Sequence, residues 1–549
     1  MIETADSGTP PTGAPVKAFE REATGLVREL STWDVALFNF AILGFLFELY
    51  FVVSLVPLLG GNIWLAFLFT AAMSSLLLYT YYAFHVAMPR SGGDYVFVSR
   101  SLLPSLGFIG NASYILTLLI YNGITGVTIQ TTGLSVGFLL IGVLTHSTGL
   151  VTLSTDVSTT TGTLVLGTLE IVLLAIPTML GKRFYFRIQN VVYVLVFIAV
   201  LTMIGLLVTA SHATFVTDFN NFSASQGYGP NYYQTVFTTA RTLGWVNPSQ
   251  TSGFDTVLIF PVLSLYGFNF IASTYLGGEI RRPARNSLYG MFGAMFAAMG
   301  LTALFFFALY RTVGEPFVSA TDFLIYNQIP LTAFPVLPYA NFLSLMLTNN
   351  SIIIGFVAMM GVLQMCIYIP GFYYMGARSM LAWSFDGILP RSLSNVSPRF
   401  HTPINAIIVL VILSEFSLIL LNVPYTAAKI YLFSTVLTWY ACLTPLMLVG
   451  IAAVIFPFRL KKIHDASPAN YRIFGIPVIS LTGVGTIVFS VLVIYLELTN
   501  SVYGANTALA IEAVVAFILI FAAIYFVAKY WRKAQGRPLD MAFKEIPPE

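Results

Sequence analysis

Two polar side chains interrupt apolar segments of this sequence at places where they could bind a ligand. Glu48 lies within the apolar run 35–59. Asn269 stands two residues after Gly267 in the stretch 264–286, SLYGFNFIASTYLGGEIRRPARN. An ionisable group inside a membrane span costs roughly 2.5–3.5 kcal/mol on insertion scales, so it is by default a functional candidate. Glu48 is therefore a candidate to bind a substrate cation or to carry a proton. The structural alternative is that it reaches external water or pairs inside the bundle.

Patterns that support enzymatic chemistry are missing from the sequence. It contains no His/Cys/Asp cluster, no phosphate-binding Walker loop and no nucleophile elbow. Cys366 and Cys442 both fall inside apolar runs, so we expect them to pack rather than to form a disulfide. We therefore predict that the protein is not an enzyme and holds no metal or cofactor.

The composition places the polar residues in a lipid environment. Of the 549 residues, 57% are hydrophobic and only 9% are charged. A soluble domain needs far more charge to cover its surface, so this chain must use lipid as its solvent. The net charge of +3 is too small to suggest a nucleic-acid partner.

Apolar runs of about 20 residues predict membrane-spanning helices. About twelve such runs occur, which predicts an all-α membrane protein. The runs are 35–59, 63–88, 105–144, 162–180, 184–210, 256–276, 287–310, 346–385, 403–421, 425–456, 474–498 and 507–530. Three of them are longer than the bilayer is thick, so we expect these helices to be tilted or to extend beyond the membrane.

Basic residues in the loops predict the orientation. An even number of spans places both termini on one side, and that side carries all of the 26 basic residues except Arg241, Arg311 and Lys429. Lysine and arginine concentrate on the cytoplasmic side of membrane proteins. We therefore predict a multi-pass protein of the cell membrane with both termini cytoplasmic.

The segments outside the spans divide into tails and loops. Residues 1–32 are rich in Pro, Gly and Thr and lack an apolar core, so we expect a disordered cytoplasmic tail. Residues 532–549 form a second cytoplasmic tail. Residues 211–255 form a long external loop, and the more apolar loop 312–345 is expected to act as a lid.

Two blocks of five spans indicate an inverted repeat. The first and sixth spans both carry interior glycine beside polar residues, and each opens a block, 33–210 and 256–457. Because five is odd, the second block enters the membrane from the opposite side. Interrupted segments at matching places in two such halves indicate a transporter's central site. Residues 458–531 then form two peripheral helices.

Three stretches on the basic side carry a family resemblance. They are MPRSGGDYVFVSRSLLPSLGF (88–108), GGEIRRPARN (277–286) and ARSMLAWSFDGILPRSLSNVSPRFHTPINAI (377–407). In order and spacing they resemble the amino acid–polyamine–organocation (APC) superfamily of permeases, from about residue 31 to residue 456. The resemblance implies that the first and sixth helices are each broken near the bilayer middle.

The implied breaks, at 41–46 and 266–270, predict the substrate site. Free N–H groups at a broken helix end bind an α-carboxylate, and free carbonyls bind an α-ammonium. The predicted substrate-binding residues are Ile42, Leu43, Gly44, Phe45, Glu48, Tyr266, Gly267, Phe268 and Asn269. The first helix departs from the family's Gly-x-Gly pattern because Leu46 replaces the second glycine, which leaves the backbone there less room for a carboxylate.

Charged residues on the cytoplasmic side predict an inner gate. Glu279 is followed by Arg281, and Arg378 lies in the third of the three stretches. Charge pairs among these residues would hold the gate shut, and the alternative is a solvated loop that only anchors the topology. We assign Glu279, Arg281 and Arg378 to gating.

The sequence leaves the coupling ion undetermined. Val196 stands where some family members place a lysine in the fifth helix, and residues 352–377 of the eighth lack the Ser or Thr that sodium-coupled relatives use. Exchange, uniport and a proton mechanism based on Glu48 therefore all remain open. The sequence likewise indicates no oligomeric state.

The resemblance leads to one main functional hypothesis and two alternatives. The main one is a secondary-active amino acid permease that works by alternating access on a small-molecule substrate in the lipid bilayer. The first alternative is a permease of the same fold for a polyamine or another organic cation, which Glu48 and the lost glycine favour. The second is a substrate sensor that does not transport.

Overall fold

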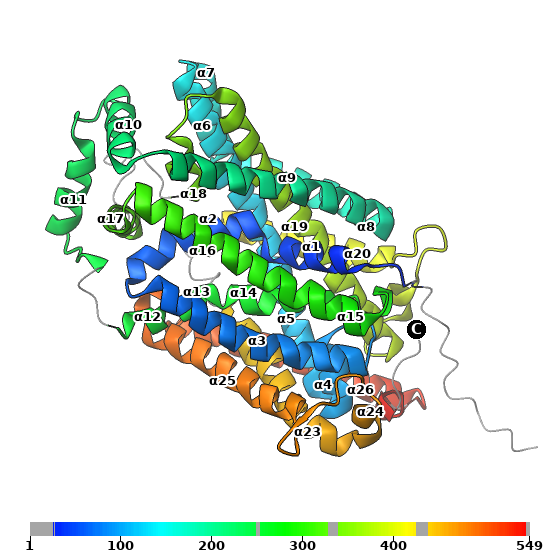
Figure 1. Cartoon of the computed structure of the whole chain (residues 1–549). Coiled ribbons are helices and arrows are strands. Elements are labelled where there is room, and N and C mark those ends of the chain that lie inside the picture. Colours follow the sequence, from blue (N-terminus) through cyan, green and yellow to red (C-terminus); the bar gives the residue numbers. More distant parts are fainter. Residues whose placement is uncertain are drawn as a thin grey trace, which may run out of the picture.

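Long apolar helices make up nearly all of the described chain (Figure 1). The computed structural model describes residue 26 and residues 28–248, 253–327, 339–423, 438–537 and 539–544. Strands in these residues are limited to one antiparallel pair, β1 (Arg472–Ile473) with β2 (Ile476–Pro477). The predicted all-α fold class is confirmed.

Within the described residues, 11 helices are long and apolar enough to cross a membrane, and a bent helix pair raises the number to 12. The bent pair is α1 (Thr32–Leu43) with α2 (Phe45–Leu59). Seven of the other spans are single helices: α3 (Ile63–Ala87), α8 (Thr160–Met179), α9 (Lys182–Thr209), α19 (Ser351–Phe385), α20 (Ile404–Asn422), α25 (Val478–Thr499) and α26 (Ala508–Ala534). Three spans consist of consecutive segments: α5–η1–α6 (Pro104–Thr128, Ile129–Leu134, Ser135–Leu144), α12–α13–α14–η3 (Asp255–Leu258, Phe260–Leu263, Leu265–Phe268, Asn269–Tyr275) and α15–η5–α16 (Pro283–Leu288, Tyr289–Gly293, Ala294–Thr312). The remaining span, Thr438–Arg459, includes η8 (Cys442–Leu446) and α23 (Met447–Arg459).

These spans follow the predicted runs closely, and the predicted multi-pass membrane protein is confirmed. The start of the run 425–456 lies outside the described residues. The longest spans are Pro104–Leu144 with 41 residues and Ser351–Phe385 with 35, as expected for runs that exceed the bilayer thickness. The inverted relation between the two blocks stays a prediction.

The first span is broken at Gly44, as predicted. α1 ends there because Gly44 adopts left-handed backbone angles, φ 64° and ψ 52°, and α2 continues at 40° to α1. Glycine adopts a positive φ without the steric cost that a Cβ imposes. A Cβ at this position would also lie 3.1 Å from the ring of Tyr368.

The sixth span changes its winding rather than its direction. Short α-helical segments run to Phe268, and Asn269–Tyr275 then form the 3₁₀ helix η3. A 3₁₀ run of seven residues is uncommon because its hydrogen bonds have poorer geometry, and such runs often mark a hinge. The predicted break at 266–270 falls at this transition. Unlike α1–α2, the segment Asp255–Tyr275 counts as one continuous span among the described residues.

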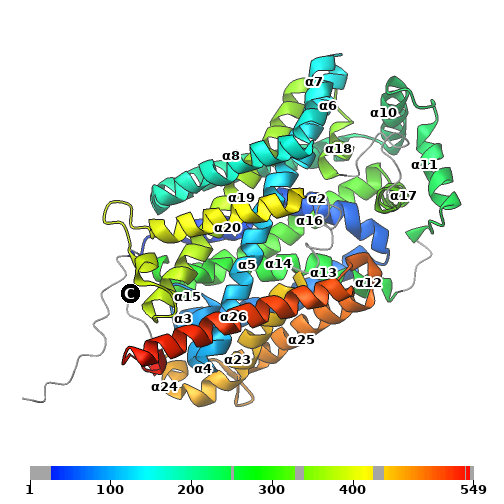
Figure 2. The same ribbon diagram turned by 180° about the vertical axis from the view of Figure 1, so that it is seen from behind.

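Burial separates central spans from peripheral ones. The apolar window of Asp255–Tyr275 is 83% buried, whereas that of Ala508–Ala534 is only 17% buried. Leu519 and Ile520 on α26 are exposed, as suits side chains that meet lipid tails. α26 runs along one side of the bundle in Figure 2, in agreement with its prediction as a peripheral helix.

Short helices cover the end of the bundle opposite to the C-terminus (Figures 1 and 2). They include α10 (His212–Ser225), α11 (Tyr232–Thr242), α17 (Glu315–Tyr326) and α18 (Ala340–Leu345). α17 packs against α2 and α11, and Trp245 Nε1 donates a hydrogen bond to Ser319 Oγ at 3.1 Å. The expected lid, 312–345, is thus helical over α17 and α18, and residues 328–338 lie outside the described chain.

The end of the bundle near the C-terminus is called the basic end here, because Arg100, Lys182 and Arg378 lie there. Its short elements are α4 (Asp94–Ser101), η4 (Gly277–Glu279), η7 (Arg391–Ser394), α24 (Lys461–Asp465) and η10 (Leu539–Lys544). Two further short elements, α7 (Thr148–Val157) and η9 (Ser501–Tyr503), connect spans elsewhere in the chain.

The predicted disordered tail 1–32 is corrected at its described end. The N–H groups of Glu29 and Leu30 both donate to the Glu279 carbonyl, at 2.8 and 2.9 Å. Leu30 is 4% exposed and pairs with Ile280 in a parallel bridge. The backbone after η4 is extended, so it offers the free hydrogen-bonding groups that this segment binds. Residues 1–25 and 27 lie outside the described chain.

Candidate functional site

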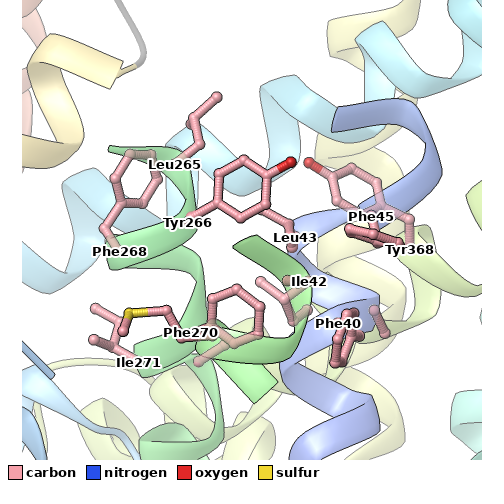
Figure 3. Close-up of a cluster of buried hydrophobic side chains, with 14 of the residues drawn as sticks. Phe40, Ile42, Leu43, Phe45, Leu265, Tyr266, Phe268, Phe270, Ile271 and Tyr368 are labelled. Carbon is pink, nitrogen blue, oxygen red and sulfur yellow. The ribbon is translucent and has the colours of Figure 1, made fainter. Parts of the chain in front are cut away.

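A cavity of about 440 Å³ lies beside the break in the first span. Its walls come from α2, from α5 and η1, from the α14–η3 transition and from α19. Figure 3 shows α1 and α2 beside the α14–η3 segment, with aromatic and aliphatic side chains packed between them. The two spans with irregular winding therefore meet at one place inside the bundle.

Glu48 gives the cavity its charge. Among the described residues of the lining it is the only acidic one, and none of them is a lysine, arginine or histidine. The side chain is buried, and Glu48 Oε1 has no hydrogen-bond partner in the described part of the chain. An unpaired carboxylate in a low-dielectric site attracts a cation strongly and repels an anion. The cavity is therefore suited to an ammonium group.

The rest of the lining combines hydroxyl groups with aromatic rings. Thr117, Tyr121 and Thr131 contribute hydroxyls from α5 and η1, and Asn269 contributes an amide. Phe47, Phe268 and Phe372 contribute rings, whose faces attract cations when water is excluded. This lining offers a ligand both hydrogen bonds and an apolar wall.

The N-terminus of α2 is occupied by a side chain. The N–H groups of Leu46 and Phe47 donate to Gln364 Oε1 at 2.8 and 3.1 Å. Gln364 is fully buried on α19, and its Nε2 has no hydrogen-bond partner among the described residues. These N–H groups are the kind that the sequence resemblance assigns to a substrate carboxylate. In this structure an uncharged amide oxygen takes that place.

The predicted substrate residues divide into two sets. Leu43, Glu48, Phe268 and Asn269 line the cavity. The others are buried at the two predicted breaks but are not part of the lining. They are Ile42, Gly44 and Phe45 in the first span and Tyr266 and Gly267 in the sixth.

Each residue of the second set contacts protein instead. Phe45 packs edge-on against Phe40 at 5.3 Å between ring centroids, and Tyr266 OH shares a hydrogen bond with Thr302 Oγ1 at 2.7 Å. A Cβ on Gly267 would lie 2.5 Å from Ser74 Oγ, so this glycine lets the sixth span approach α3. The glycine serves helix packing rather than the cavity wall.

Sequence reasoning missed the lining residues on two other spans. On α19, Tyr368 and Phe372 line the cavity. Gln364, which binds the N-terminus of α2, precedes them at the same four-residue spacing, so all three lie on one face of the helix. Thr117 and Tyr121 have the same spacing on α5. Polar side chains that recur every four residues in an apolar run indicate one polar face of a helix, and this pattern could have identified the face that lines the cavity.

Two of the three residues assigned to gating form a buried ion pair. Arg378 Nε donates to Glu279 Oε1 at 2.8 Å, and the side chains are 0% and 1% exposed. Lys182 Nζ lies 3.5 Å from Glu279 Oε2. Arg281 is exposed and its Nε donates to the Arg28 carbonyl at 3.4 Å, so it does not pair with Glu279. The extended backbone of Ile280 turns the chain outward between Glu279 and Arg281.

The segment 28–31 extends this charge network. Glu29 lies 3.8 Å from Lys182 Nζ and accepts hydrogen bonds from Arg183. The Arg183 hydrogen bond holds the pKa of Glu29 below its usual value. Charged side chains from four separate parts of the chain therefore form a connected set of ion pairs at the basic end.

Among the described residues, no group of three or more His, Cys, Asp or Glu side chains is placed to hold a metal ion.

Comparison with known families gives one match. A family model described as amino acid permease matches residues 36–537. None of the curated proteins matches the sequence. The matched segment contains the first span from Ala36 onward, all the other described spans, the described residues that line the cavity, and Glu279, Arg281 and Arg378.

Proposed function

The chain belongs to the amino acid permease family, and from this premise we propose that it is a secondary-active amino acid permease that works by alternating access. This is a family of transporters rather than enzymes. The substrate enters the cavity from one side of the membrane, and the bundle then closes on that side and opens on the other.

The observation that carries the proposal is the cavity at the break in the first span, where Glu48 is the one charged side chain among the described lining residues. The α-ammonium of an amino acid binds the Glu48 carboxylate, and the side chain of the amino acid lies against the rings of Phe47 and Phe268. Its carboxylate takes the N–H groups of Leu46 and Phe47, from which it displaces Gln364 Oε1.

One observation favours a second candidate, a permease for an amine without a carboxylate. Such a substrate needs only Glu48, and Gln364 stays on the N-terminus of α2. The described part of the cavity lining offers a carboxylate no cationic side chain. The two candidates therefore differ in whether Gln364 must move.

We further propose that the protein lies in the cell membrane with its basic end in the cytoplasm. All but three of the basic residues belong to this side by their place between the spans. The Glu279–Arg378 pair is then the inner gate, and α10, α11 and α17 lie outside.

Counterflow into proteoliposomes tests the function. We expect unlabelled amino acid trapped inside the vesicles to drive entry of the same labelled amino acid. The panel pairs L-lysine with cadaverine and L-leucine with 3-methylbutylamine, so that each pair differs by the carboxylate. Counterflow of the amines alone would establish the second candidate. No counterflow with either class, together with a thermal shift on ligand addition, would indicate a sensor instead.

Gln364→Ala separates the two candidates further. The change frees two N–H groups at a helix N-terminus, so we expect the amino acid to bind about tenfold more tightly, since a hydrogen bond to a charged group contributes roughly 1.5–3 kcal/mol. The affinity for the matched amine should stay the same. Gln189→Ala, which removes another fully buried glutamine from α9, is the control. An equal effect on both ligands would show that Gln364 does not compete with a carboxylate.

A further inference from the structure

A second buried carboxylate lies outside the cavity, at the basic end. Asp94 is the first residue of α4 and is 1% exposed. Its Oδ1 accepts hydrogen bonds from Tyr275 OH at 2.7 Å and from Asn111 Nδ2. Asp94 Oδ2 has no hydrogen-bond partner in the described part of the chain. One oxygen of the carboxylate is thus buried with room for a proton.

Within the described parts of the chain, no cation neutralises this carboxylate. The ionisable groups that interact with Asp94 are three phenols, Tyr81 from α3, Tyr114 from α5 and Tyr275 from η3. Asp94 therefore receives hydrogen bonds but forms no ion pair among the described residues.

The arginines nearby have partners of their own. Arg100, on the same helix, binds both carboxylate oxygens of Asp386 at 2.8 and 2.9 Å. Arg378 on α19 binds Glu279, and Arg459 on α23 donates to the Leu102 carbonyl. His85 on α3 is buried against Gly277.

The residues around Asp94 hold the end of η3 in place. Gly92 N donates to the Tyr275 carbonyl at 3.1 Å, and Ser91 pairs with Leu276 in an antiparallel bridge. A Cβ on Gly93 would lie 2.9 Å from the Tyr275 ring, so that ring rests directly on the Gly93 backbone. We call residues 91–94 against 275–277 the Asp94 clamp. The end of η3 cannot leave the basic end without removing Tyr275 from Asp94.

The clamp and the cavity are joined by η3. Asn269, the first residue of η3, lines the cavity, and Tyr275, its last residue, binds Asp94. Tyr114 also lines the cavity, and its ring lies 5.9 Å from that of Tyr275. One short, irregularly wound segment therefore has the substrate cavity at one end and the buried carboxylate at the other.

We propose that Asp94 is a proton-binding site whose proton crosses the membrane together with the substrate. The inference rests on the proposed transport function. While the clamp is closed, the cavity is open to the side of the membrane opposite the basic end. A proton from the water on that side passes through the cavity and past Tyr114, binds Asp94 Oδ2 and neutralises the buried carboxylate. When the clamp opens, Asp94 meets water at the basic end and releases the proton there. The proton gradient thereby drives uptake of the substrate.

The pKa of Asp94 is shifted in the direction that the proposal requires, upward in the closed clamp. Burial raises the pKa of Asp94 from 3.8 to about 6, against the hydrogen bonds from Tyr275 and Asn111, which lower it. In the open clamp the hydrated carboxyl returns to the ordinary pKa of aspartate, about 3.9. The closed clamp binds the proton more tightly, so it gains stability as the pH falls through about 6. Above that pH the closed clamp holds an unpaired buried charge.

Hydrogen–deuterium exchange of the purified full chain, without ligand, tests the proton site. Between pH 8 and pH 5, after correction for intrinsic exchange, we expect the protection factors of the η3 amides to rise about tenfold. In Asp94→Asn they should be the same at both pH values. The control is Asp322→Asn, which removes another buried carboxylate with unpartnered oxygens, on α17 at the opposite end. This control should respond to pH as the wild type does.

A second variant keeps the test decisive if Asp94→Asn does not fold. Tyr275→Phe removes a hydrogen bond that lowers the Asp94 pKa, so the midpoint of the protection change should move to higher pH. An unchanged midpoint would overturn the proposal, as would a wild type without pH dependence or an Asp94→Asn protein that keeps it.

Transport separates this inference from the function on which it rests. With L-lysine, L-leucine and cadaverine as probes, counterflow by the wild type tests the permease. Accumulation driven by an imposed pH gradient tests the coupling, and Asp94→Asn should lose it while Asp322→Asn keeps it. Counterflow without gradient-driven accumulation in the wild type would refute the proton site alone. If counterflow itself is absent, the permease proposal fails.

Discussion

Replacing Arg378 with methionine is expected to destabilise the protein and to abolish transport. Arg378 is fully buried and its Nε donates to Glu279 Oε1 at 2.8 Å. Without it, Glu279 keeps only Lys182, 3.5 Å away, as an ion-pair partner. Breaking a buried ion pair from one side costs about 3–5 kcal/mol, because the remaining charge stays buried. The melting temperature of the purified protein in detergent and uptake into proteoliposomes measure the effect.

The matched variants separate the pair from a general effect of losing arginine. Arg281→Met removes an exposed arginine that does not contact Glu279, so its melting temperature should stay close to that of the wild type. The double variant Glu279→Gln, Arg378→Met removes both charges and should recover much of the lost stability. Equal melting temperatures for Arg378→Met and Arg281→Met would contradict the role given to the pair.

The sequence suggested Arg281 as a partner of Glu279, because a sequence shows only which residues are neighbours along the chain. Arg281 stands two positions from Glu279, whereas Arg378 stands 99 positions away. Glu279 ends a short 3₁₀ turn with its side chain buried, and the extended residue Ile280 then directs Arg281 to the surface. The direction of a side chain at an irregular helix end depends on backbone angles that composition does not encode.

The spans and the break at Gly44 could be predicted because their causes are local. A long apolar run must form a helix in lipid, since its backbone groups have no other partners there. Gly44 ends α1 because glycine alone adopts its backbone angles at little cost. These properties depend on a few consecutive residues.

The phase of the helices around the breaks could not be predicted. Beyond Gly44 the helix resumes in a new direction, and beyond Phe268 it continues with 3₁₀ winding. A helical wheel drawn through either point therefore assigns side chains to the wrong faces. Gly267 was assigned to the substrate site from the implied break alone, and that break does not indicate that the glycine faces Ser74 of α3.

Contacts between spans were also beyond the sequence. The Gln364 side chain reaches the N-terminus of α2 across 318 positions of the chain. Its spacing with Tyr368 and Phe372 could indicate a face of α19, but not that this face meets the break. The substrate site thus depends on packing that only the folded chain specifies.

Glu48→Gln is expected to cause the largest loss of substrate affinity. The change keeps the shape of the side chain and removes the only charge that the described residues bring to the cavity lining. Loss of one partner from a buried charge pair costs roughly 2–5 kcal/mol. The KM for a substrate with an ammonium group should therefore rise about thirtyfold or more, since 1.4 kcal/mol corresponds to a factor of ten.

The control is a glutamate with similar burial in a different place. Glu497 on α25 is 2% exposed, and its Oε2 also has no hydrogen-bond partner among the described residues. It does not line the cavity, so Glu497→Gln should leave the KM within about twofold of the wild type, as expected for a site without ligand contact. A similar rise in KM for both variants would mean that Glu48 acts through stability rather than through the substrate.

Glu48→Gln also decides which of the two buried carboxylates carries the proton. If Glu48 binds the ammonium and Asp94 the proton, Glu48→Gln raises the KM but leaves the pH dependence of the remaining transport in place. Asp94→Asn then removes that pH dependence instead. If Glu48→Gln abolishes the pH dependence while exchange of substrate between the two sides continues, Glu48 is the proton carrier. Proton binding would then have to be assigned to Glu48 instead of Asp94, and Glu48 would no longer be the proposed binding site for the substrate ammonium group.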